Sequence, residues 1–325
     1  MLVSGSALIV ANAVALAGAL GWLVCLILPA AHAVRVRNAF LLRRGRPEDF
    51  GWTPSAVPGD FRSERMPPPD PIQGAVDAAG VATLDGDWPR ALALVDMLVR
   101  HARHEGGIRA DLATTFRGIV AGYGYCADYV RVYLAAARGA GLFCRQWAFS
   151  FDGFGGHGHT VVEIYDRQRQ RWALLDVHNN VYAVRAGSDA PLDALALRRA
   201  LLAEPAAVEF RRAGPGRLGF PHFDKLLDYY RRGADEWYLW WGNDVISRER
   251  SGPIRRLSGR FAHRLDSTLG RLPPLVILAT AENESAIARM ESLRRRVVAA
   301  TGLCAALAAS LGALLLWQSL PRRHA

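Results

Sequence analysis

Cysteine is scarce in this chain of 325 residues, which contains only four. Cys25 and Cys304 lie in apolar stretches near the two ends, so only Cys126 and Cys144 belong to the middle of the chain. Two cysteines in a region of that size do not form a disulfide framework. The Cys-x-x-Cys spacing typical of zinc sites is also absent. We therefore expect no disulfide-stapled fold, no structural metal and no other cofactor.

Charged side chains are absent from two long stretches, residues 1–31 and 297–320. Each stretch exceeds the ~20 residues that a helix needs to cross the hydrocarbon core of a bilayer. We predict transmembrane helices over residues 6–34 and 297–318. The first could instead be a signal peptide, cleaved near Ala-His-Ala at 31–33. It lacks a positively charged start and is too long for one, so a retained helix is favoured.

Lysine is almost missing, and nearly all basic residues are arginine. Eight arginines flank the two apolar stretches on the sides that face the middle of the chain. Three arginines, 294–296, precede the second stretch, and only Arg322 and Arg323 lie beyond it. Five follow the first stretch: Arg35, Arg37, Arg43, Arg44 and Arg46. Arginine close to a span resists translocation. The sequence therefore predicts a two-pass protein of the cell membrane with its soluble region in the cytoplasm.

The net charge of +10 has a related explanation. Arginines beside a membrane span are attracted to anionic lipid headgroups. A nucleic-acid-binding protein would show a basic helix face with interleaved aromatics, or a known reader motif, and we find neither. The lipid bilayer is therefore an expected partner and nucleic acid is not. The sequence does not indicate an oligomeric state.

Proline and arginine set residues 35–75 apart from the rest of the soluble region. Residues 47–72 alone carry seven prolines, including Pro-Pro-Pro-Asp-Pro at 67–71. Such a sequence cannot continue a helix and favours extended backbone. We interpret it as a semi-rigid linker between the membrane and the domain.

The next region, residues 76–190, carries helix signals first and strand signals afterwards. Helices are predicted over 87–103, 111–121 and from 126 to 139 or 141. Strands are predicted over 143–151, 159–166 and 171–177, separated by short turns as in an antiparallel meander. Helices followed by strands indicate an α+β domain. Residues 191–290 are predicted to be mainly helical, with the tryptophans at 237, 240 and 241 in the core.

Cys126 occupies an unusual place, where the glycine-rich turn GYGY becomes a helix. One interpretation is a small hydrophobic residue packed under the turn, as most buried free cysteines are. The other is a nucleophile whose thiolate is stabilised by the helix N-terminus. The local sequence does not decide between them.

The predicted strands supply partners for the second interpretation. His159 begins the second strand and Asp176 ends the third, so a short turn between antiparallel strands places them at one edge of the sheet. A cysteine at a helix N-terminus, a histidine that takes its proton and a carboxylate that orients the imidazole form a nucleophilic triad. The backbone N–H of Cys126 would then donate to an oxyanion. Zinc ligation by the same three residues lacks a fourth ligand.

These residues lie in blocks that resemble the three motifs of the transglutaminase-like superfamily. The blocks are Gly-Tyr-Cys-Ala-Asp-Tyr (124–129), His-Thr-Val-Val-Glu-Ile (159–164) and Trp-Ala-Leu-Leu-Asp-Val (172–177). The resemblance covers about residues 110–180 and implies a papain-like core with Cys126, His159 and Asp176 as catalytic triad. Family members usually carry an aromatic residue where this chain has Val161. Asp128 and Glu163 are interpreted as structural.

The resemblance implies a membrane-anchored cysteine enzyme that acts on a peptide or protein amide through a thioester. It favours a protease or amidase over a crosslinking acyltransferase. The alternative is a catalytically silent scaffold, in which the same fold serves as a binding module at the membrane, because fold alone does not establish activity.

Overall fold

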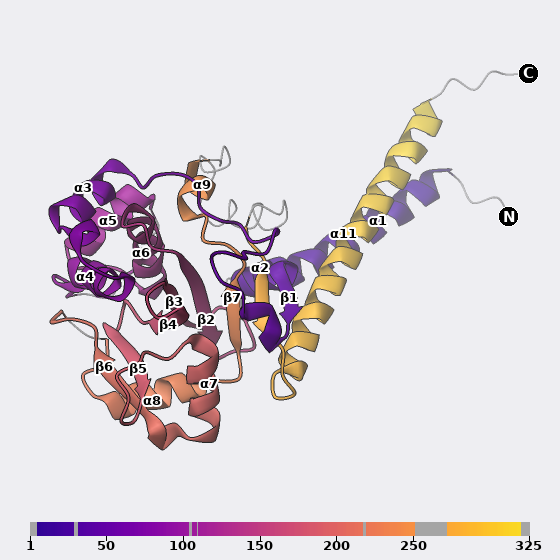
Figure 1. Ribbon diagram of the computed structural model, residues 1–325. Coiled ribbons are helices and arrows are strands. Elements are labelled where there is room, and N and C mark those ends of the chain that lie inside the picture. The colour runs from indigo at the N-terminus through magenta and orange to yellow at the C-terminus, as the bar shows by residue number, and fades with distance from the viewer. Residues whose placement is uncertain are drawn as a thin grey trace, which may run out of the picture.

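The computed structural model describes residues 5–28, 32–103, 106–108, 110–216, 219–250 and 272–319. The protein is α+β and contains a mixed six-stranded sheet with the order β1-β8-β7-β2-β3-β4 (Figure 1). Its strands are β1 (Leu42–Gly45), β2 (Cys144–Ser150), β3 (Gly158–Asp166), β4 (Arg171–Leu175), β7 (Trp237–Trp240) and β8 (Leu275–Leu278). The β1–β8 pair is parallel and the other pairs are antiparallel. A separate hairpin pairs β5 (Val181–Arg185) with β6 (Val208–Arg212).

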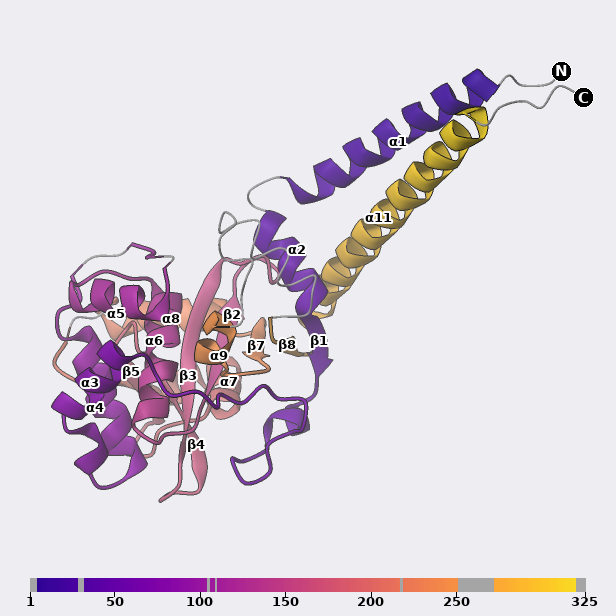
Figure 2. The ribbon, with the colours of Figure 1, turned by 90° about the horizontal axis from the view of Figure 1, so that it is seen from above.

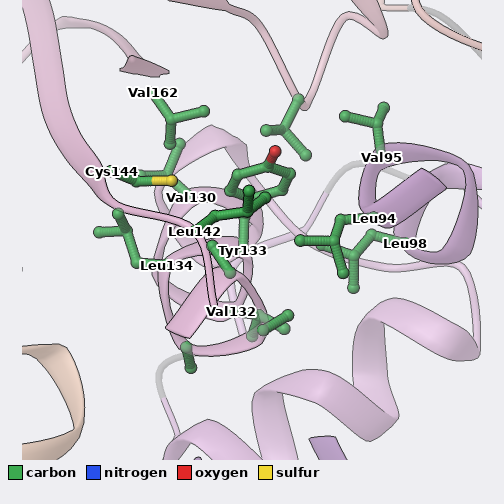
Figure 3. Close-up of a cluster of buried hydrophobic side chains, with 14 of the residues drawn as sticks. Leu94, Val95, Leu98, Val130, Val132, Tyr133, Leu134, Leu142, Cys144 and Val162 are labelled. Carbon is green, nitrogen blue, oxygen red and sulfur yellow. The ribbon is translucent and has the colours of Figure 1, made fainter. Parts of the chain in front are cut away.

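Helices cover both faces of the sheet. One face packs against α4 and α6, beside which α3 and α5 lie, and the other face packs near α7 and α8. The bounds are α3 (Asp70–Ala78), α4 (Asp87–Val99), α5 (Leu112–Val120), α6 (Cys126–Gly139), α7 (Ala194–Ala203), α8 (Phe223–Arg232) and the short α9 (Val245–Arg250). Successive side chains along each strand point to opposite faces of the sheet, so the sheet separates two hydrophobic cores. Val162 and Cys144 face α6, as Figure 3 shows, whereas Trp147 and Val161 pack toward α7 and α8.

The elements predicted inside residues 76–190 are present, with shifted ends. Helix α4 stops at Val99, four residues before the predicted end, and β4 stops at Leu175, two residues early. A buried ion pair fixes the hairpin between β2 and β3, because Arg145 Nε lies 2.6 Å from Glu163 Oε2. Glu163 also accepts from the backbone N–H of Ala194, the first residue of α7, which gives it the structural role expected.

The linker interpretation of residues 35–75 was wrong. Residues 32–41 form helix α2 (His32–Leu41), and the next four form β1 inside the main sheet. The proline-rich stretch then lies along the domain, since Phe50, Phe61 and Ile72 are buried in its cores. Helix α3 begins at Asp70 inside the proline run, because proline fits the first turn of a helix. The apolar side chains between the prolines bind the stretch to the domain.

The interpretation of residues 191–290 as mainly helical missed three strands. Among the described residues of that region, β6, β7 and β8 accompany the helices. Strand β7 pairs with β2, and β8 with β7, so the sheet continues well beyond residue 190. Trp237 and Trp241 are buried in the core as predicted, and Trp240 is partly buried. Four residues of β7 are too few to show a period against the helical signals around them.

Two helices, α1 (Gly5–Ile27) and α11 (Glu284–Ser319), are long and apolar enough to cross a membrane. They run side by side away from the domain (Figures 1 and 2), and Asn12 Nδ2 donates to Ser310 Oγ over 2.7 Å between them. The pair is compatible with a two-pass membrane protein. Helix α1 ends seven residues before the predicted 34. Residue 31 of the candidate cleavage site lies outside the described residues.

Candidate active site

The turn before α6 places Cys126 as the first residue of that helix. Gly124 has a φ of 130°, and a Cβ there would lie 3.0 Å from the ring of Tyr129, so glycine is required. The carboxylate of Asp128 accepts from the backbone N–H of Tyr125 at 3.0 Å and of Ile108 at 3.2 Å, the structural role expected for it. The Cys126 side chain is partly exposed. Its amide lies in the first turn, where a helix supplies no carbonyl partner.

His159 is the second residue of β3, and its side chain is buried. The ring nitrogen Nε2 lies 2.7 Å from Oδ2 of Asp176, which follows β4 directly. Strands β3 and β4 are adjacent, with Val162 opposite Leu175, and this register places the carboxylate beside the imidazole. Because Nε2 faces Asp176, Nδ1 is the nitrogen left for the Cys126 thiol.

Asp176 is fully buried and receives several hydrogen bonds besides that of His159. Asn179 donates from its backbone N–H at 3.1 Å and from Nδ2 at 2.7 Å, and the Tyr230 hydroxyl donates at 2.7 Å. Burial alone would raise the pKa of Asp176, but the His159 charge and these donors together lower it to about 2. The carboxylate is therefore ionised at neutral pH.

The pKa of His159 moves in the opposite direction. Burial acts to lower it, but the negative charges of Asp176 and Cys126, together with hydrogen bonds to both side chains, raise it to about 10. The imidazole is therefore protonated at neutral pH and lies between a carboxylate and a sulfur. The sulfur of Cys126 is thus the second partner of this imidazole, on the side away from Asp176.

Aromatic side chains enclose the imidazole. The ring centroids of Phe149 and Tyr229 lie 5.6 and 5.5 Å from that of His159, and the ring of His178 lies 6.1 Å away. They limit the access of water to the His159–Asp176 pair, which strengthens its electrostatic interaction. The family motif usually has an aromatic residue at the position of Val161. Here Val161 lies two residues after His159 in β3 and is fully buried in the core that packs toward α7 and α8.

The structure thus brings together the three residues selected from the sequence and adds two more. Asn179 had a weak local signal, since Asp-x-x-Asn after a strand is typical of a turn closed by side chains. Tyr230 had none, because it comes from α8, more than fifty residues along the chain. Among the residues that the structure describes, no group of three or more His, Cys, Asp or Glu side chains could hold a metal ion.

No family model, curated protein or solved structure matches this chain.

We expect Tyr230→Phe to lower kcat about tenfold with little change in KM. The ring would keep its packing, but Asp176 would lose one hydrogen bond to its charged oxygen, a contact worth about 1.5–3 kcal/mol. A carboxylate held less firmly as an anion stabilises the imidazolium less, so the alkaline limb of kcat/KM should move to lower pH. The measurement is a pH–rate profile of the purified variant.

Tyr133→Phe is the matched control. Tyr133 is also fully buried and donates one hydrogen bond, to the Ala91 carbonyl at 3.1 Å, on the α6 side of the sheet. Both variants should lose stability, but only Tyr230→Phe should shift the alkaline limb. Identical profiles for the two variants would contradict a positioning role for Tyr230.

Proposed function

We propose that this protein is a membrane-anchored, transglutaminase-like cysteine enzyme that acts on a peptide or protein amide bond. The observation that carries the proposal is the buried imidazole of His159, which bonds Asp176 at one nitrogen and has the Cys126 thiol as its other partner. A cysteine that only fills space does not need a charged histidine and an ionised carboxylate behind it.

The proposed reaction begins with the Cys126 thiolate attacking the amide carbonyl carbon. The backbone N–H of Cys126 donates to the oxyanion that forms. Imidazolium then gives its proton to the leaving amine as the C–N bond breaks, and a thioester remains on Cys126. A water molecule, deprotonated by the now neutral His159, attacks the thioester, and the C–S bond breaks to release the carboxylic acid and restore the Cys126 thiolate beside the His159 imidazolium. A second amine in place of water would give acyl transfer instead, and we favour hydrolysis.

The two apolar helices support the membrane part of the proposal. Both leave the same side of the domain and pack against each other, so one domain would be held at two points of a bilayer (Figure 2). The arginines that border the two apolar stretches on the domain side favour a cytoplasmic location for the domain.

We expect iodoacetamide at pH 6 to alkylate Cys126 at least ~100-fold faster than Cys144, because alkylation requires an accessible thiolate. Cys144 is buried among the side chains of the α6 core (Figure 3), and burial raises the pKa of its thiol. The measurement is the rate of mass labelling of each cysteine-containing peptide. Cys126→Ala should remove the fast phase, and His159→Ala should slow it.

Every sample carries Cys25→Ala and Cys304→Ala, so the cysteines of the two apolar helices do not contribute to the labelling. Equal, slow alkylation of Cys126 and Cys144 would show that Cys126 is only a packed side chain, and the proposed nucleophile would be lost.

A further inference from the structure

The helix that follows the first apolar helix is tied to the loop that leads into the candidate active site. Helix α2 begins at His32, and Val34 lies only six positions after Leu28, which is just past the end of α1. Six residues span at most about 21 Å of extended chain. The first turns of α2 therefore lie close to the membrane end of α1.

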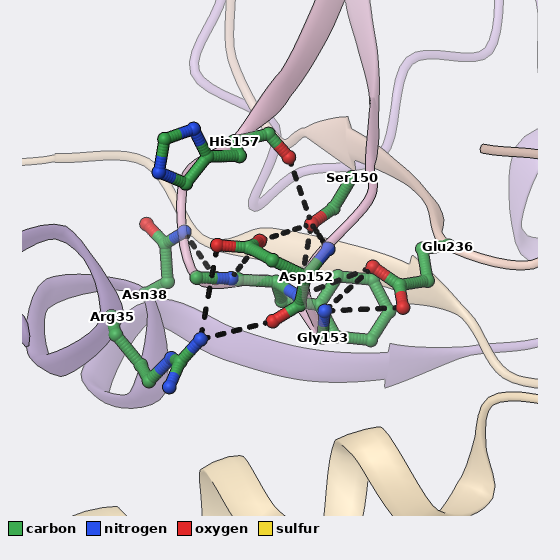
Figure 4. Close-up of polar contacts among 9 residues, drawn as sticks. Arg35, Asn38, Ser150, Asp152, Gly153, His157 and Glu236 are labelled. Carbon is green, nitrogen blue, oxygen red and sulfur yellow. Dashed lines mark hydrogen bonds and ion pairs between the residues drawn. The ribbon is translucent and has the colours of Figure 1, made fainter. Parts of the chain in front are cut away.

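The loop between β2 and β3 packs against these first turns (Figure 4). Asn38, itself buried, donates from Nδ2 to the Phe154 carbonyl at 2.7 Å, and Arg35 donates to the Asp152 carbonyl at 3.1 Å. At Gly156 a Cβ would lie 2.4 Å from a methyl group of Val34, so the backbone of the loop touches α2 directly. The loop is therefore held about as close to the end of α1 as the start of α2 is.

His159 lies only three residues beyond Gly156, which is about 10 Å along a strand. The site therefore lies at the end of β3 that faces α2, which is also the end nearest to α1.

The second apolar helix is tied to the same place. Asn283, directly before α11, donates from Nδ2 to the Asp235 carbonyl at 2.6 Å. The neighbouring Glu236 accepts from the backbone N–H of Gly153 in the β2–β3 loop at 2.9 Å (Figure 4). Both apolar helices thus connect to one loop, and the domain has little freedom to turn its active-site edge away from the bilayer.

We infer that the substrate is a membrane-anchored polypeptide whose reacting amide lies within about ten residues of the lipid surface. The reaction at the amide rests on the proposed function. The position of that amide near the bilayer rests on the contacts of α2 and α11 with the β2–β3 loop. A chain of ten residues reaches at most about 35 Å, which is comparable with the sum of about 21 Å from Leu28 to Val34 and about 10 Å from Gly156 to His159.

The test measures how far from the bilayer the Cys126 thiol lies, and it needs no known substrate. The full chain, carrying Cys25→Ala and Cys304→Ala, is reconstituted into vesicles of phosphatidylcholine and phosphatidylglycerol. Chloroacetamide, from which a thiolate displaces chloride, is attached to phosphatidylethanolamine directly or through Gly/Ser linkers of about 10 or about 30 residues. Each labelling rate is divided by the rate of the same thiol with soluble chloroacetamide.

The control thiol is Leu84→Cys in a Cys126→Ala background. Leu84 is exposed and belongs to the segment that connects α3 to α4. These two helices lie at the end of the domain away from α1 and α11 (Figures 1 and 2). The 10-residue reagent should label Cys126 at least ~10-fold faster than Leu84→Cys after normalisation, since only the first thiol lies within its reach. The 30-residue reagent should label both.

Each contrary result has its own meaning. Equal normalised rates for the two thiols with the 10-residue reagent would show that the site is not near the bilayer. Rapid labelling of Cys126 by the linker-free reagent would favour a lipid amide over a polypeptide. Both results overturn the inference and leave the cysteine chemistry intact. A Cys126 no more reactive than Leu84→Cys toward soluble chloroacetamide would instead remove the proposed function.

Discussion

We expect His159→Ala to lower kcat/KM by about 10⁴-fold or more, because the same imidazole serves the thiol, the leaving amine and the attacking water. Loss of one member of a nucleophile–base pair costs almost as much as loss of both. In the resting protein, His159 bridges Cys126 and the buried Asp176. The measurement is kcat/KM on an amide substrate, or the rate of labelling by a thiol-directed amidase probe.

His157→Ala is the matched control, since it removes an imidazole two residues earlier. The side chain of His157 is exposed. Its carbonyl oxygen accepts from Ser150 Oγ (Figure 4) and from the Phe151 amide. This variant should therefore keep most of the activity. If His157→Ala were inactive and His159→Ala active, the base would be assigned to the wrong residue.

The parts of the fold that the sequence predicted are those that form between neighbours in the chain. The β2–β3–β4 meander follows from alternating apolar residues and short turns, and it alone brings His159 to Asp176. The start of α6 at Cys126 follows from the glycines before it. Local signals of this kind placed Cys126 at the start of a helix and His159 and Asp176 at neighbouring ends of two strands.

The parts that were missed depend on pairing over long distances. Strand β1 pairs with β8, more than two hundred residues away, and neither strand exceeds four residues. Their side chains show no period long enough to recognise. Tyr230 reaches Asp176 only because α8 packs on the far face of the sheet. Such contacts are set by the tertiary fold, which a single sequence does not reveal.

The second large effect concerns Asp176→Asn, which should lower kcat/KM by about 10- to 1000-fold while the protein stays folded. In serine enzymes the same change costs about four orders of magnitude, because the carboxylate stabilises an imidazolium that forms only during the reaction. Here His159 is already protonated in the resting protein, with a pKa raised to about 10, so less charge develops for Asp176 to stabilise.

The pH dependence of stability should change as well. The pKa of Asp176 is lowered from 3.8 to about 2, so its contribution to stability is full above pH 3.8 and is lost as pH falls through about 2. The pKa of His159 is raised from 6.5 to about 10, so its contribution is full below pH 6.5 and is lost as pH rises through about 10. The free energy of unfolding of the variant should therefore lie furthest below that of the wild type between about pH 4 and 6.5.

Asp166→Asn separates catalysis from stability. Asp166 is also buried and accepts from the backbone N–H groups of Gln168 and Arg169 at 3.1 Å, but it ends β3 at the opposite end from His159. Its replacement should cost stability without lowering kcat/KM.

Breaking the buried His159–Asp176 pair by Asp176→Asn should lower the free energy of unfolding by at most about 3–5 kcal/mol. Full activity of Asp176→Asn on a real substrate would reduce the triad to a Cys126–His159 dyad, and Asp176 would then only close the end of a buried strand.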